Sequence, residues 1–119
     1  MVSKLNWDSV PTETVNPFMS RQIVSGDKLM IAKIKFKDGF IVPLHSHIHE
    51  QVTQVISGKM RFWFGANKEH TMDLEPGDVI VIASDLPHEA LMIGDVVEVD
   101  TWAPPRRDWL DKTDAYLRK

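Results

Sequence analysis

The chain contains no cysteine among its 119 residues, so its fold and its chemistry must do without disulfide bonds and thiolates. It also lacks a long apolar run. The longest, VIVIA at 79–83, is far shorter than the ~20 residues that a helix needs to cross a bilayer. A formal net charge of −3 gives no electrostatic basis for binding nucleic acid or an anionic membrane. The N-terminal stretch MVSKLNWDSV lacks the apolar core of a signal peptide. We therefore expect a soluble, cytoplasmic protein.

Short apolar runs separated by turn signals dominate the sequence from residue 21 onward. The length predicts one domain over 1–119, with a β-barrel core at about 21–103. Turn signals such as Asp-Gly and Pro-Gly separate the runs, which predict strands at 28–36, 45–56, 60–64, 71–75, 78–83, 88–93 and 96–102. This spacing is typical of an antiparallel sandwich or barrel.

The C-terminal tail at 105–118 has a different pattern. Pro105 suits the first turn of a helix, and Trp109, Leu110, Tyr116 and Leu117 recur at helix-like spacing. The sequence therefore predicts an all-β antiparallel barrel with one short C-terminal helix packed on it.

Histidine is scarce, with five in the chain, yet three alternate in PLHSHIHEQ at 43–51. On one continuous strand, His45, His47 and Gln51 would share a face, and neutral imidazole is a frequent metal ligand. His88, directly after a proline, would join them if its strand lies antiparallel beside theirs. A histidine-rich surface strand and a buried hydrogen-bonded histidine pair are the alternatives. His49 is expected to line a pocket or to lie at the barrel mouth.

A second group of functional side chains occurs in VEVDTWAPPRRDWL at 97–110. Asp100 and Trp102 share a strand face, and Arg106 follows two stiff prolines. An aromatic ring that stacks on a sugar, and an arginine that holds a carboxylate, would suit a sugar acid. A buried aspartate can act as general acid or base. The structural alternative is a salt bridge from Asp100 to Arg106 or Arg107, with Trp102 in the core.

The chain resembles the cupin superfamily in two motifs. The first has a glycine, H-x-H, a usually acidic position and a second glycine, matched in order by Gly39, His45, His47, Gln51 and Gly58. The second has a proline-glycine turn and a late histidine, which here are Pro76, Gly77 and His88. The resemblance implies a jelly-roll barrel, or double-stranded β-helix, that holds one divalent metal ion at His45, His47, Gln51 and His88.

Gln51 stands where most cupins have glutamate. Its carbonyl oxygen can bind a metal but brings no charge, so the ion would be a stronger Lewis acid although it would be held more weakly. An empty site is the alternative. The ligand types suit Ni, Zn, Fe, Co and Mn, and they do not identify the metal.

HSHIHEQ together with DTWAPPRRDWL is similar to the pectin-degradation cupins of the KdgF type. That resemblance implies a site of three histidines and a glutamine that opens 4,5-unsaturated galacturonate to a linear keto-uronate. It also implies catalytic roles for the residues at the family's aspartate, aromatic and arginine positions, which here are Asp100, Trp102 and Arg106. The family commonly has phenylalanine in place of Trp102. Met60, Phe62 and His49, with Trp102 and Arg106, would line the substrate pocket.

We therefore expect a metal-dependent enzyme that acts on an unsaturated uronate of pectin or alginate type. An iron-dependent dioxygenase and a non-catalytic ligand-binding or sensing module remain as alternatives. Val97, Val99 and Thr101 should turn an apolar face outward, and either the N-terminal segment at 7–18 or a second subunit must cover it. We expect a homodimer.

Overall fold

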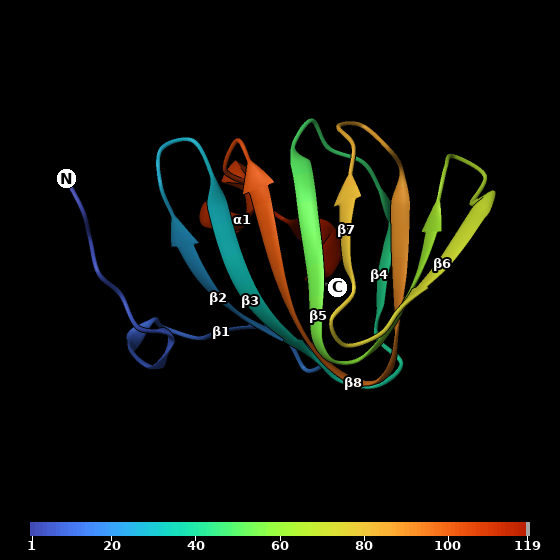
Figure 1. The fold of residues 1–119 in the computed structure, drawn as a ribbon, viewed down its shortest axis with the longest axis horizontal. Coiled ribbons are helices and arrows are strands. Elements are labelled where there is room, and N and C mark those ends of the chain that lie inside the picture. The colour runs from blue at the N-terminus through green and yellow to red at the C-terminus, as the bar shows by residue number, and fades with distance from the viewer. Residues whose placement is uncertain (119) are drawn as a thin grey trace.

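Eight antiparallel strands form one curled sheet in the computed structural model, which describes residues 1–118 (Figure 1). The strands are β1 (Glu13–Asn16), β2 (Met19–Ser25), β3 (Met30–Phe36), β4 (Ile41–His45), β5 (Glu50–Phe64), β6 (His70–Leu74), β7 (Val79–Ile82) and β8 (His88–Ala103). Their order is β1-β2-β3-β8-β5-β6, with β4 paired to β8 and β7 paired to β5. The predicted all-β antiparallel barrel with a short C-terminal helix is confirmed.

Two of the strands are long and bent, where the sequence predicted pairs of short strands. β8 spans the predicted strands at 88–93 and 96–102, and β5 spans most of those at 45–56 and 60–64. The pairing of β5 with β8 changes register next to Gly58. Gly58 has φ +82, and a Cβ there would lie 2.1 Å from the carbonyl oxygen of Asp95. Only glycine fits this close approach, so the predicted turns at 57–59 and 94–95 are irregularities within continuous strands.

The prediction of a single strand at 45–56 is wrong at its start. β4 ends at His45, residues 46–49 form a loop, and β5 begins only at Glu50. The amide of Asp85 donates a 2.8 Å hydrogen bond to the carbonyl oxygen of His47, which ties this loop to the turn before β8. The loop, rather than strand alternation, therefore positions the histidines.

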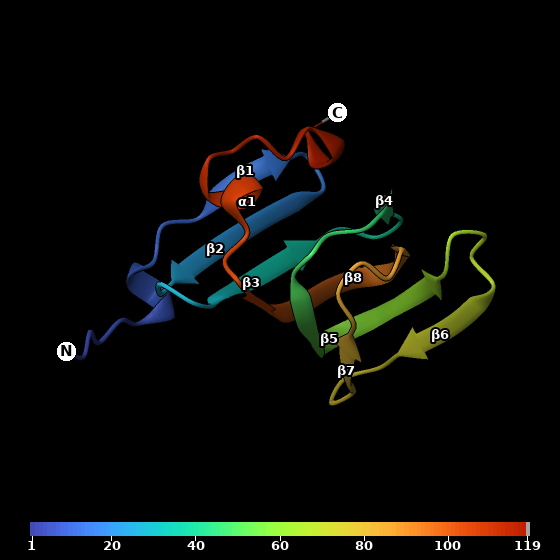
Figure 2. The ribbon, with the colours of Figure 1, turned by 90° about the horizontal axis from the view of Figure 1, so that it is seen from above.

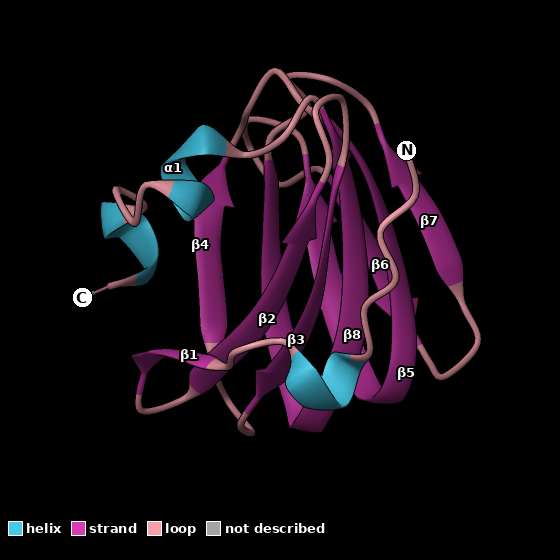
Figure 3. Cartoon of the chain, turned by 90° about the vertical axis from the view of Figure 1, so that its left-hand side faces the viewer, coloured by secondary structure: helices cyan, strands magenta, loops and turns pink. Residues whose placement is uncertain are grey.

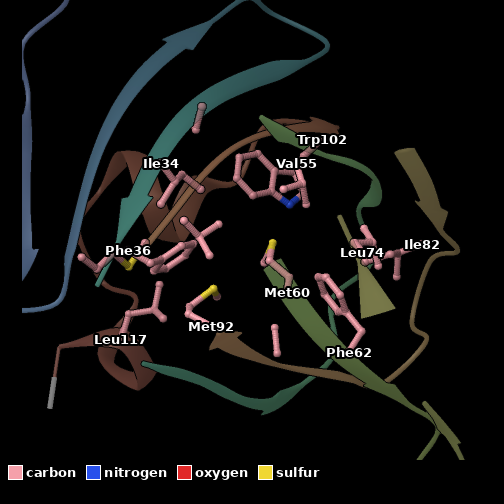
Figure 4. Close-up of a cluster of buried hydrophobic side chains, with 14 of the residues drawn as sticks. Ile34, Phe36, Val55, Met60, Phe62, Leu74, Ile82, Met92, Trp102 and Leu117 are labelled. Atoms are coloured by element: carbon pink, nitrogen blue, oxygen red, sulfur yellow. The ribbon is translucent and has the colours of Figure 1, made fainter. Parts of the chain in front are cut away.

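The hydrophobic core lies inside the barrel (Figure 4). Its largest members include Ile34, Phe36, Val55, Met60, Phe62, Leu74, Ile82, Met92, Trp102 and Leu117. On β8, the inward residues include Glu98 and Asp100 as well as Trp102, and all three are buried. Two carboxyl groups therefore point into an otherwise largely apolar interior.

The C-terminal tail packs between β1 and β2 on one side and β4 on the other (Figures 2 and 3). It holds α1 (Arg107–Leu110) and the 3₁₀ turn η2 (Ala115–Leu117), so the single helix expected over 105–118 is divided into two short turns. Arg21 on β2 forms a 2.6 Å ion pair with Asp114, and neither side chain is exposed. The Arg21 guanidinium group also lies 4.3 Å from the ring centroid of Trp109. None of the helices within 1–118 has the length and apolar character needed to cross a membrane.

The N-terminal segment covers only one edge of the outer sheet surface. Its 3₁₀ turn η1 (Trp7–Ser9) lies against β2, where Gln22 Nε2 donates hydrogen bonds to the carbonyl oxygens of Trp7 and Val10 at 2.6 and 2.8 Å. Residues 1–6 are exposed and extend away from the barrel (Figure 1). The outer faces of β5 and β7 are not covered by these contacts.

Candidate metal centre

Three of the five histidines come together at one end of the barrel. His45 is the last residue of β4, His47 lies in the following loop, and His88 opens β8 directly opposite His45. One ring nitrogen from each lies within 4.8 Å of the others, which is close enough for all three to hold one metal ion. The expectation that the strand beginning at His88 lies beside His45 is confirmed by this pairing.

Hydrogen bonds to the backbone fix the tautomer of all three imidazole rings. Nδ1 of each ring is hydrogen-bonded at 2.8, 3.0 and 2.8 Å to the carbonyl oxygens of Pro43, His49 and Leu86, respectively. A carbonyl oxygen only accepts, so each neutral ring carries its hydrogen on Nδ1 and a lone pair on Nε2. Nε2 of His88 is buried without a partner among the described residues. Metal-binding histidines commonly donate their second nitrogen to a carbonyl in this way.

Gln51 directs its amide oxygen toward the histidines. Its Oε1 accepts a 2.8 Å hydrogen bond from Nε1 of Trp102, and its Nε2 donates a 2.9 Å bond to Oγ1 of Thr53. Oε1 also lies 3.1 Å from Nε2 of His47. Because His47 carries its hydrogen on Nδ1, neither atom of this contact has a hydrogen to donate, and two lone pairs face each other. A cation held by both atoms would turn this repulsion into attraction.

The surroundings of the three histidines favour the neutral form of each ring. Burial lowers the pKa of His45 to about 3, with added repulsion from a charge on His88. Burial likewise lowers the pKa of His47 to about 4, with added repulsion from Arg106, and it lowers the pKa of His88. Neutral imidazole is the form that binds a metal. The three donors are therefore available at neutral pH without a proton having to be displaced.

A hydrogen-bond chain connects Gln51 to a buried carboxyl group. Thr53, which accepts from Gln51, donates a 2.6 Å bond to Oδ1 of Asp100. Burial raises the pKa of Asp100 to about 6, although the Thr53 hydrogen bond acts in the opposite direction. Glu98 lies two residues away on the same strand face, and burial, together with the Asp100 carboxyl group, raises its pKa well above the usual value.

Arg106 is almost fully buried. Only 3% of it is exposed, and its Nε and Nη2 donate to the two carboxylate oxygens of Asp108 at 3.0 and 2.8 Å. Nη2 also donates to the Tyr116 hydroxyl at 2.9 Å. Its ion partner is therefore Asp108, and the described residues contain no Asp100–Arg106 salt bridge of the kind considered from sequence.

Trp102 is almost fully buried, with 1% exposed. Its ring centroid lies 4.7 Å from that of Trp109, and the Arg106 guanidinium group lies 5.7 Å from it. The indole N–H is used to hold Gln51. Stacking of Trp102 on a substrate stays a prediction, whereas its contact with Gln51 was not foreseen.

A small cavity lies beside the histidines. Its polar lining includes His45, Gln51, His88, Glu98, Asp100, Arg106 and Tyr116. Of the predicted pocket residues, Met60 and Phe62 line the cavity and His49 does not. The cavity volume is about 40 Å³, which holds only a few water molecules. A sugar acid could enter only if side chains at its mouth move.

Sequence reasoning missed Thr53, Glu98, Asp108 and Tyr116. The ring centroid of Tyr116, in η2, lies 4.8 Å from that of His45, a contact that depends on how the tail folds back and has no local signal. Glu98 did have a signal, because it alternates with Asp100 and Trp102 in VEVDTW. Strand periodicity alone places all three side chains on one face.

Comparisons with known proteins identify a family and similar folds. A family model described as "Cupin domain" matches residues 33–103, which is more than half of the chain. The curated proteins include no match. Among solved structures, the chain is similar to KdgF from Halomonas sp., with a TM-score of 0.80 and 26% identity over 90% of this chain and 99% of that one.

Two further structures are similar. An RmlC-like cupin from Shewanella frigidimarina NCIMB 400 has a TM-score of 0.78 and 25% identity, over 86% of this chain and 90% of that one. The polyketide cyclase RemF from Streptomyces resistomycificus has a TM-score of 0.71 and 18% identity, over 87% and 80%. The last likeness concerns the fold alone.

Proposed function

The chain belongs to the cupin family, and on this basis we propose that it is a metal-dependent enzyme that opens a 4,5-unsaturated galacturonate-type uronate to a linear keto-uronate. The observation that carries the proposal is the convergence of three imidazoles with fixed tautomers and one amide oxygen beside a buried acid. The likeness to KdgF from Halomonas sp. supports the choice of substrate class.

His45, His47, Gln51 and His88 would hold one divalent ion. The unpartnered Nε2 of His88 and the lone-pair contact between His47 and Gln51 both fit a cation at this point. All four donors are neutral, so the charge of the ion would remain largely uncompensated. When bound, a Ni, Zn, Fe, Co or Mn ion would supply Lewis acidity toward a substrate oxygen.

Asp100 is the proposed proton carrier. With a pKa of about 6, it is present in both protonation states near neutral pH, which suits a general acid or base. As acid, it would deliver a proton to C4 of the enol ether while water supplies a hydroxyl group to C5. The resulting hemiketal then opens to the ketone. Thr53 would keep the Asp100 carboxyl group oriented toward the substrate.

Arg106 is the proposed anchor of the substrate carboxylate. Its Nε and Nη2 are bound to Asp108 and Tyr116, whereas its Nη1 makes no hydrogen bond within residues 1–118. Nη1 could thus bind a carboxylate oxygen while Asp108 holds the rest of the group in place. Trp102 would act mainly through its bond to Gln51 and as a wall of the pocket, together with Met60 and Phe62.

Steady-state assays on unsaturated galacturonate test the proposal. Asp100→Asn keeps the shape of the side chain but cannot carry the proton, so kcat should fall roughly 10²–10⁴-fold, with little change in KM and none in metal content. The exposed Asp111 offers a matched control, Asp111→Asn, which should behave as wild type. Wild-type kcat in Asp100→Asn would remove Asp100 from the mechanism and make His49 the next candidate. Turnover without oxygen would separate this reaction from that of a dioxygenase.

We also propose that a second copy of the chain covers the outer sheet face. By strand register, one row across five strands consists of Val24, Ile31, Thr101, Val52 and Val81. Val81 is 67% exposed. An apolar row of this width is typical of an interaction surface, and the N-terminal segment contacts only its β2 edge.

A further inference from the structure

Glu98 carries a buried carboxyl group beside that of Asp100, and one of its two oxygens is unpaired. The residue is 3% exposed, and its Oε2 has no hydrogen-bond partner among the described residues. Its neighbours across the sheet are the apolar Ile34 on β3 and Val55 on β5. No ion pair within residues 1–118 includes it, in contrast to the other buried acid outside the site, Asp114.

Such a group destabilises the fold. An unsatisfied buried polar atom costs free energy, so stability alone would favour an apolar side chain of the same size. Burial and the Asp100 carboxyl group raise the pKa of Glu98 well above its usual value, so this environment favours the neutral, protonated form of the group. A neutral carboxylic acid both donates and accepts hydrogen bonds. A sugar hydroxyl group does the same, so the two groups can pair.

The Glu98 side chain lines the cavity next to the candidate metal centre. Same-face residues on a strand lie ~6.7 Å apart, which is comparable to the length of a pyranose ring with its substituents. A sugar whose reacting carbon lies at Asp100 would therefore extend toward Glu98. In the free protein, the few waters that the cavity has room for can satisfy the carboxyl group, and a ligand hydroxyl group would displace them.

We propose that Glu98 is a substrate-recognition residue that hydrogen-bonds a hydroxyl group of the sugar acid at the inner end of the cavity. The inference rests on the proposed function, because it takes the ligand to be a polyhydroxylated acid. It adds a determinant of specificity to that function: the site discriminates against ligands that lack this hydroxyl group, since the buried Oε2 of Glu98 would then stay unpaired.

The test compares Glu98→Met and Glu98→Gln with wild type in metal-loaded protein. Calorimetry would measure the binding of D-galacturonate and of its 2-deoxy and 3-deoxy analogues. Glu98→Gln keeps hydrogen-bonding groups and should bind galacturonate within about threefold of wild type. Glu98→Met should bind it roughly 5–50-fold more weakly, as expected when a buried hydrogen bond is lost. It should also lose the preference for galacturonate over one deoxy analogue, with unchanged metal content and an equal or higher Tm.

The outcomes separate the two proposals. If wild type binds galacturonate and Glu98→Met binds it equally well with the same preference, the role of Glu98 is refuted while the proposed function stands. If metal-loaded wild type binds neither galacturonate nor unsaturated galacturonate, the proposed function fails and the role of Glu98 fails with it. If Glu98→Met does not fold, calorimetry on the wild type alone tests the inference. Equal affinity of the wild type for galacturonate and for both deoxy analogues would overturn it.

Discussion

At the scale of single residues, the chemistry of the site is set by the backbone of its own loops. Each of the three histidines donates its Nδ1 hydrogen to a carbonyl group two residues away, at Pro43, His49 or Leu86. Local chain direction therefore selects the tautomer. The three Nε2 atoms are left free without the carboxylate partners that often orient such histidines.

Gln51 is oriented differently, by a residue distant in sequence. The indole N–H of Trp102 and the hydroxyl group of Thr53 distinguish the oxygen from the nitrogen of the Gln51 amide. If the amide were turned over, two donors would face each other at Trp102. Trp102 therefore fixes which atom of Gln51 faces the histidines.

A substitution at Trp102 tests this role. Trp102→Phe removes the N–H but keeps an aromatic side chain, so the protein should fold while Gln51 loses its orientation. Residues that orient metal ligands typically contribute roughly 10–100-fold to metal affinity, and we expect a loss of that size, measured by competition with a chelator. The partly exposed Trp63 provides the control, because Trp63→Phe should leave affinity unchanged. Unchanged affinity in Trp102→Phe would show that Gln51 needs no support from the indole group.

At the scale of elements, the sequence pattern predicted strand bounds correctly where apolar runs are short and bounded by clear turns. β3, β6 and β7 lie within two residues of their predicted bounds. β1, β2 and β4 were not predicted as strands, because Pro17 separates the first two and Pro43 lies inside the third, and proline weakens a strand pattern. The sequence did not show that β5 and β8 are each one continuous strand, because a glycine with positive φ gives the same local signal in a bulge as in a hairpin turn.

The candidate site, too, was only partly predictable from the sequence. Motif spacing identified His45, His47 and His88, which the fold brings together. It could not show that Tyr116 packs on His45, because that contact depends on the tail. The predicted short helix is present as α1, but the helical tail is interrupted near Lys112, whose φ of 57 is incompatible with a continuing right-handed helix.

A buried ion pair helps to hold the tail in place, and its contribution can be measured. Asp114→Asn should remove the charge that compensates Arg21 and lower the free energy of unfolding by about 3 kcal/mol. That is the low end for a buried pair, since Glu13 remains 2.8 Å from Arg21. Urea denaturation would measure the change. Asp73→Asn is the control, because Asp73 pairs with Lys59 and Arg61 at the surface, where such pairs contribute at most about 1 kcal/mol. Equal effects of the two substitutions would contradict a tail held by the Arg21–Asp114 pair.

At the scale of the whole molecule, the barrel has two faces of different character. Its interior combines an apolar core with the histidines, Glu98 and Asp100. Its outer surface carries the row from Val24 to Val81, which a single chain covers only at the β2 edge. The site lies inside one barrel, so a second copy would affect stability and solubility without having to supply a residue to the chemistry.

Light scattering at low micromolar concentration tests whether two copies join through this row. We expect wild type to be a dimer with an interface of more than about 1,000 Å² in total. Val81→Lys should yield a folded monomer, because Val81 is 67% exposed and a lysine there fits a single chain but places a charge in the apolar interface. Met72→Lys serves as the control, since Met72 is also exposed, at 47%, but lies on β6 at the far end of the sheet order. Its dimer should persist. A monomeric wild type would refute the dimer. A dimer that survives Val81→Lys would show that the interface lies elsewhere, and the exposed segment at 1–6, which includes Met1, Val2 and Leu5, would be the next one to remove.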